Sequence, residues 1–338
     1  MISLYKPDRG DATLNRSSSS VLVNAANAVP VPKKKSLLSR FLSRWESPVA
    51  GYLFLAPWLI GLFLLTFWPM LQSLYFSFTK YSLLEQPEWT GFGNYERIFT
   101  SDAVFIQSLK VTFLFVLFSV PLKLFAALLI ALLLKQNIRG MSFYRTMVYL
   151  PSLIGTSIAV SILWRNIFNS DGLFNQLLGL FGIEGMNWIS NPKTALGTLI
   201  LLVVWQFGSS MVIFLAGLKQ ISTELYEASS VDGATKIRQF FSITLPMLSP
   251  VILFNLVLQT IGSFQMFTQA FIITHGGPIN STYMYALYLY DRAFGRLQMG
   301  YASALAWIML VIIAVCTALI FVSAKHWVFY ENDGGKKG

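Results

Sequence analysis

The amino-acid sequence predicts an all-α, polytopic membrane protein with six transmembrane helices and a charged helix-turn-helix on the cytoplasmic side. Three observations predict this fold class. The composition is 55% hydrophobic and only 12% charged, which is about half the charged share of roughly 25% in globular proteins. Six apolar runs are long enough to cross a bilayer, and one compact charged insert separates two of them. A soluble domain with this balance could not cover itself with polar surface.

The six apolar runs each come close to, or exceed, the roughly 20 helical residues that cross a bilayer core of about 30 Å. They cover residues 49–68, 111–134, 146–164, 194–218, 247–273 and 297–324. The runs are continuous and show no period of two, so they predict helices rather than the strands of a barrel.

The basic residues predict the orientation in the membrane. With the N-terminus inside, the cytoplasmic segments hold 17 of the 25 Lys and Arg residues, the outer segments hold seven, and Lys123 lies within the second run. This asymmetry predicts that both termini are cytoplasmic. It also accounts for the net charge of +10 without a nucleic-acid partner.

The sequence divides into three regions. Residues 1–47 form a polar, basic tail, residues 48–325 form the transmembrane domain, and residues 326–338 form a second cytoplasmic tail. The first tail is expected to be disordered through about residue 31. Beyond that point two interpretations stay open: a solvated tail, or an amphipathic helix over 36–46 on the inner membrane surface.

The charged insert between the fourth and fifth runs is predicted to form two short helices. Ser222 can cap a first helix over about 223–231, and Glu224 suits its first turn. Gly233 can take a positive φ and turn the chain. A second helix over about 235–243 follows, and Pro246 suits the first turn of the fifth span.

The insert also carries a motif. It is similar to the cytoplasmic signature of permease subunits in ATP-binding-cassette (ABC) importers, which reads Glu-Ala-Ala, three residues, Gly, nine residues, Ile-x-Leu-Pro. The spacing matches, and Ser229 stands where the second alanine is usual. The resemblance implies that residues 221–246, the coupling segment, dock into a groove of an ATPase subunit. The residues that it assigns to this contact are Glu227, Ala228, Ser229, Asp232, Gly233, Ala234, Leu245 and Pro246.

The resemblance extends over roughly residues 48–325 and is closest to sugar importers of the maltose, glycerol-3-phosphate and multiple-sugar type. Further matching stretches are "GFGNYERIF" at 91–99, "RGMSFYRTMVYLP" at 139–151 and "GYASALAW" at 300–307. It implies a second permease subunit, an ATPase dimer, an extracytoplasmic solute-binding protein and a bacterial or archaeal plasma membrane. The sequence contains no phosphate-binding P-loop, so ATP and Mg²⁺ are expected in the partner ATPase and no cofactor in this chain.

Candidate substrate contacts occur on the third, fourth and fifth spans, where polar side chains recur at helical spacing. The helical spacing on the fifth span singles out Asn255, and the resemblance places the sugar path on Leu202, Gln206, Ser209, Gln259, Gly262, Ser263 and Met266. Small and polar residues also hold membrane helices together, so this alternative stays open for each of them. Lys123, the one charge well inside a span, is costly there and is therefore a candidate too, for substrate or for a neighbouring helix.

Other functions are less well supported by the sequence. An ion-coupled carrier is expected to have carboxylates inside the membrane, and none of the six runs contains Asp or Glu. Cys316, His275 and His326 are the only cysteine and histidines, so neither a metal site nor an enzyme active site is predicted. A permease for another solute, such as glycerol-3-phosphate, remains the alternative.

Overall fold

The computed structural model describes residues 48–136 and 138–329. These residues are mainly helical, as predicted, with loops between the helices and a two-stranded hairpin of β1 (Thr79–Lys80) and β2 (Glu88–Trp89) that the sequence did not indicate. The expectations for residues 1–47, including the helix over 36–46, and for the end of the C-terminal tail lie outside the described residues. Contacts divide the chain into two units that meet between Trp68 and Pro69.

The described part of the first unit is helix α2 (Pro48–Gly61) followed by the π-helical turn η1 (Leu62–Phe67). The second unit begins within α3 (Trp68–Ser77). By length and hydropathy, the first candidate membrane span covers Gly51–Ser77. The expected end at residue 68 was therefore wrong, because the helix continues through a less apolar stretch that includes Gln72 and Ser73.

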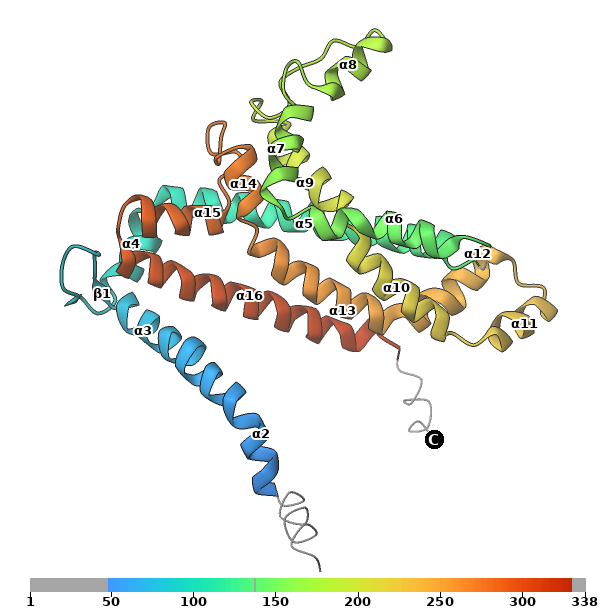
Figure 1. Cartoon of the computed structure of the whole chain (residues 1–338), viewed down its shortest axis with the longest axis horizontal. Helices are drawn as coiled ribbons and strands as arrows, with labels where there is room; N and C mark the ends of the chain where they lie inside the picture. The colour runs from blue at the N-terminus through green and yellow to red at the C-terminus, as the bar shows by residue number, and fades with distance from the viewer. Residues whose placement is uncertain (1–47, 137, 330–338) are drawn as a thin grey trace, which may run out of the picture. The chain divides into compact units, whose positions relative to one another are not determined.

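Three long helices form the body of the second unit: α5 (Ala103–Leu134), α13 (Leu245–Phe264) and α16 (Met299–Trp327). Helix α13 packs against both α5 and α16 (Figure 1). Helix α5 begins eight residues before the predicted position, since the side chain of Asp102 caps it by accepting from the N–H groups of Val104 and Phe105. The sixth predicted span agrees with α16 to within three residues at each end.

The third and fourth predicted spans are not continuous helices, which corrects the sequence analysis. Helices α6 (Met141–Ile154) and α7 (Ile158–Ile167) meet at 96°, and α9 (Ala195–Trp205) and α10 (Gly208–Gln220) meet at 43°. After the first break the helix begins again at α7, with Ser157 as its N-cap. Among the described residues four helices can each cross a membrane, and the total is six if each bent pair counts as one span.

The predicted bounds of the fifth span, 247–273, were also wrong. One continuous helix runs from α12 (Lys236–Gln239) through the π-turn η2 (Phe240–Thr244) to the end of α13 at Phe264. Residues 268–273 form a separate helix, α14 (Thr268–Ile273). Pro246 lies in the first turn of α13, as expected, although the helix extends back from there through η2 and α12. A proline crowds the preceding helical turn, and the wider π-turn lies directly before it.

The remaining helices lie toward the ends of the second unit. Helices α4 (Gly93–Ser101) and α15 (Tyr285–Tyr290), with the π-turn η3 (Asp291–Gly295), lie at the end where α5 and α16 begin (Figure 1). Helix α11 (Thr223–Val231) lies at the opposite end with α12, and α8 (Leu173–Leu180) follows α7.

Candidate functional site

A cavity of about 290 Å³ lies where the breaks in the helices converge. It is bounded by α5, by Thr156 between α6 and α7, by the break between α9 and α10, and by the end of α13 with the start of α14. Five of the predicted path residues line it: Gln206, Gln259, Gly262, Ser263 and Met266. Lys123 and Gln269 line it as well. The cavity thus offers amides, hydroxyls and one ammonium group beside apolar side chains.

The other three predicted path residues lie outside the cavity lining. Leu202 is fully buried in an apolar cluster with Phe115 and Met266. Asn255 is fully buried and donates from Nδ2 to the carbonyl of Val251, 3.2 Å away. Ser209 donates its backbone N–H to the Oγ of Ser152 at 3.0 Å. A substrate role for any of the eight residues stays a prediction.

Hydrogen bonds between the two helix breaks fix the shape of the cavity. The amide Nε2 of Gln206 donates to the carbonyl of Gly155 at 2.9 Å, and Ser152 Oγ donates to the carbonyl of Gln206 at 3.0 Å. A Cβ atom at Gly155 would lie 2.6 Å from Gln206 Cδ and 2.6 Å from the carbonyl oxygen of Pro151. Only glycine therefore permits this close approach of the third and fourth spans.

The coupling segment contains the helix-turn-helix that the sequence predicted. Helix α11 has the expected bounds, with Ser222 as its N-cap. Gly233 has a φ of +76°. The N–H of Ala234 bonds to the carbonyl of Ser229 at 2.9 Å, and that of Gly233 to the carbonyl of Ser230 at 3.1 Å. This pair of bonds is the Schellman motif that terminates many helices. The second helix differs from expectation, because it continues into α13.

Gln239 joins the two helices of the coupling segment, a contact that the sequence analysis missed. Its Nε2 lies 3.1 Å from the carbonyl of Tyr226, and 2.9 Å from the hydroxyls of both Ser229 and Ser230. The hydroxyl of Tyr226 in turn lies 2.9 Å from that of Thr244. These bonds make the segment one rigid element anchored on the fifth span. No local pattern around a single glutamine indicates such a contact.

The outward surface of the coupling segment carries large apolar side chains beside charged ones of both signs. Val231, Ile237 and Phe241 are 88%, 74% and 62% exposed. Of the residues predicted to contact an ATPase, Glu227, Ala228, Asp232 and Gly233 are exposed, whereas Ser229, Ala234, Leu245 and Pro246 are half-buried. Large apolar side chains beside exposed small residues are typical of a surface that binds another protein.

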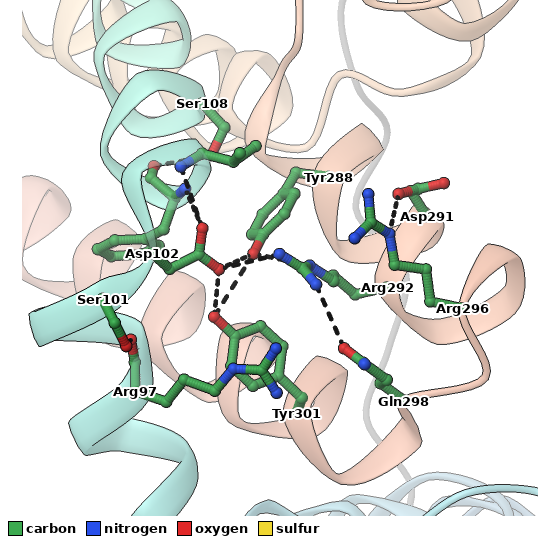
Figure 2. A network of polar contacts seen from close by, with 12 residues as sticks. Arg97, Ser101, Asp102, Ser108, Tyr288, Asp291, Arg292, Arg296, Gln298 and Tyr301 are labelled. Atoms are coloured by element: carbon green, nitrogen blue, oxygen red, sulfur yellow. Dashed lines mark hydrogen bonds and ion pairs between the residues drawn. The ribbon is translucent and has the colours of Figure 1, made fainter.

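A buried polar cluster lies at the opposite end of the unit, between the start of α5, α15 with η3, and the start of α16 (Figure 2). The Asp102 carboxylate accepts hydrogen bonds from the hydroxyls of Tyr288 and Tyr301 and forms an ion pair with Arg292 at 3.2 Å. Arg292 also donates to the Tyr288 hydroxyl at 2.9 Å and to Gln298 at 3.3 Å. The sequence analysis did not single out this cluster. Its one local signal is an aspartate directly before an apolar helical run.

Burial by itself raises the pKa of the Asp102 carboxyl. The hydrogen bonds from Tyr288, Tyr301 and the N–H of Phe105, together with the charge of Arg292, outweigh that effect and hold the pKa below its usual value. The carboxylate is therefore charged at neutral pH and ties three elements together. By contrast, the ion pair between Asp291 and Arg296 is exposed and spans 3.3 Å.

No metal-binding group of three or more His, Cys, Asp or Glu side chains occurs among the described residues.

Comparison with known proteins bears on the function of the cavity and of the coupling segment. Residues 103–328 match the family described as "Binding-protein-dependent transport system inner membrane component". The chain is 53% identical to the probable ABC transporter permease protein YesP of Bacillus subtilis, over 84% of this chain and 93% of that protein. It is 34% identical to the lactose transport system permease protein LacF of Rhizobium radiobacter, over 82% and 95% of the two chains.

The fold also matches a solved structure. A chain in the crystal structure of a bacterial ABC transporter involved in the import of the acidic polysaccharide alginate superposes with a TM-score of 0.72. The match covers 85% of this chain and 98% of that one at 22% sequence identity. It extends the likeness from the sequence to the arrangement of the helices.

Proposed function

The chain belongs to the family of binding-protein-dependent transport system inner membrane components, and from this premise we propose that it is one of two permease subunits in an ABC importer for carbohydrate. In this proposal it does no covalent chemistry. It forms half of a translocation path, and the coupling segment receives movement from an ATPase dimer that binds ATP and Mg²⁺. The lactose permease among its relatives supports carbohydrate over another solute such as glycerol-3-phosphate.

The rigid link between α11 and α13 is the observation that carries the proposal. Helix α11 is anchored through Gln239 and Tyr226 on a helix that runs without interruption from Lys236 to Phe264. Gln259, Gly262 and Ser263, near the far end of that helix, line the cavity. A displacement of α11 would therefore move one wall of the cavity, which is the coupling that an ATP-driven importer needs.

The proposed topology follows from the position of the coupling segment. The coupling segment faces the cytoplasm, where an ATPase can reach it, and both termini are cytoplasmic. The polar cluster around Asp102 then lies at the outer end, where an extracytoplasmic solute-binding protein would deliver substrate. The membrane is the plasma membrane of a bacterium or archaeon.

The experiment is ATP-driven uptake by the purified complex. This chain, its second permease, the ATPase and the solute-binding protein are reconstituted in liposomes and offered labelled oligosaccharides. We expect uptake that needs both ATP and the binding protein. Uptake by this chain alone, driven by an ion gradient, would favour a secondary carrier and refute the proposal.

A further inference from the structure

We propose, as an inference that rests on the proposed function, that the transported carbohydrate carries a carboxylate, and that Lys123 binds this group in the cavity. The substrate class is thus an acidic sugar such as a uronic-acid oligosaccharide. Lys123 is a side chain that the proposed mechanism does not otherwise use.

Lys123 is buried deep inside the second span and faces the cavity. It is 8% exposed and lines the cavity together with Gln206, Gln259 and Ser263. About 16 Å of helix separates it from Leu134, the last residue of α5, at 1.5 Å per residue. A lysine side chain is too short to reach the membrane surface over that distance, so the ammonium group stays at the level of the cavity.

The ammonium group has no counter-charge in the described part of the chain. Lys123 forms no ion pair or hydrogen bond with another described residue, and the two ion pairs found there are Asp102–Arg292 and Asp291–Arg296. By contrast, the buried face of Arg145 is satisfied, because its guanidinium donates to the carbonyl of Leu134 at 2.8 Å. An unpaired charge at this depth is expensive, so its presence points to an anion that enters the cavity.

A carboxylate fits this site better than a phosphate. One ammonium group neutralises one carboxylate, whereas a phosphate ester carries more than one negative charge. Phosphate sites commonly use the forked donors of arginine, and no arginine lines this cavity. Amides at Gln206, Gln259 and Gln269 and the hydroxyl of Ser263 remain for the sugar hydroxyls.

A second cavity has the same electrostatic character and lies at the other end of α14. It measures about 230 Å³, and its ionisable lining residues are Arg165 and His275. No Asp or Glu lines either cavity. Thr268 and Gln269 at the start of α14 line the first cavity, and Ile273 at its end lines the second. Basic groups thus line the cavities at both ends of α14.

The test uses uptake by the reconstituted importer, offered a mixture of neutral oligosaccharides, sugar phosphates, galacturonic-acid oligosaccharides and the methyl esters of those acids. The methyl ester keeps every hydroxyl and removes only the charge. Mass spectrometry identifies what enters wild type, Lys123→Met and Lys123→Arg. We expect the acids to enter wild type, with about tenfold or greater loss in Lys123→Met and most uptake kept in Lys123→Arg. Uptake of any ester that enters should not change.

The outcomes separate this inference from the proposed function. If no carbohydrate enters although ATP is hydrolysed, the proposed function fails and the inference with it. Entry of neutral sugars alone, or of sugar phosphates instead of the acids, overturns the inference and leaves an importer. Equal uptake of the acids by wild type and Lys123→Met overturns it as well. Should Lys123→Met not assemble, preference for the acids over their esters in wild type still decides between the outcomes.

Discussion

Replacing Gly155 by alanine tests whether the close crossing of the third and fourth spans shapes the cavity. The φ of Gly155 is −65°, so alanine meets no backbone strain there, and any effect comes from crowding. The new Cβ would lie 2.6 Å from the carbonyl oxygen of Pro151, which cannot rotate away. It would also lie 2.6 Å from Gln206 Cδ. If Gln206 turns aside, its hydrogen bond to the Gly155 carbonyl is lost.

The expected magnitude follows from these two effects. Overpacking a tight contact costs about 1–3 kcal/mol, and a lost hydrogen bond costs about 0.5–1.5 kcal/mol. Together they destabilise the protein by about 2–4 kcal/mol. Chains of 150–250 residues lose roughly 2–4 °C in melting temperature for each kcal/mol and longer chains lose less, so we expect a fall of several degrees, at most about 16 °C. Uptake should fall too, because Thr156 and Gln206 both line the cavity.

The matched control is Gly197→Ala on α9, where an added Cβ meets nothing within 4 Å. Alanine is also the better helix former there, by about 0.5–1 kcal/mol. We expect the control to melt at or slightly above the wild-type temperature, by circular dichroism in detergent, and to transport normally. If Gly155→Ala melts and transports like Gly197→Ala, the crossing does not shape the cavity.

Three further predictions concern the coupling segment, the outer cluster and the cavity. Gly233→Val should abolish uptake while the protein remains in the membrane, because a β-branched residue resists a φ of +76°; Gly233→Asn, which tolerates it, should retain uptake. Asp102→Asn should lower the melting temperature at neutral pH. Folding lowers the pKa of the Asp102 carboxyl, so its carboxylate stabilises the folded protein above the unfolded pKa of about 3.9. The difference in melting temperature between Asp102→Asn and wild type should therefore shrink below about pH 4. Its control, Asp291→Asn in the exposed ion pair, should change melting little. Gln259→Leu with Ser263→Leu should abolish uptake while the ATPase still co-purifies, and unaltered uptake kinetics would place the path elsewhere.

Local sequence features predicted the elements that depend on neighbouring residues. Apolar runs of sufficient length indicated the spans, and the Ser222 cap and Gly233 turn indicated α11 and its end. Each of these features acts within a few residues, so the sequence displays it directly. The spacing of Glu227, Gly233 and Pro246 also carried the resemblance that the family match supports.

Contacts between distant residues could not be predicted in the same way. The bends in the third and fourth spans are joined by the bond between Gln206 and Gly155, which lie 51 residues apart. The outer cluster brings together Asp102 and Tyr301, 199 residues apart. An apolar run indicates that a segment is long enough to cross the membrane, but it does not indicate where contacts with another helix bend that segment. For the same reason the sequence did not indicate that Leu202 packs in an apolar cluster with Phe115 and Met266.

The most direct test of the account is to identify what co-purifies with this chain. The tagged protein is extracted gently from native membranes, and its partners are identified by mass spectrometry. The account predicts a second permease and an ATPase in the complex, with ATP hydrolysis stimulated by carbohydrate once the solute-binding protein is added. A chain that purifies alone and still transports after reconstitution would contradict it.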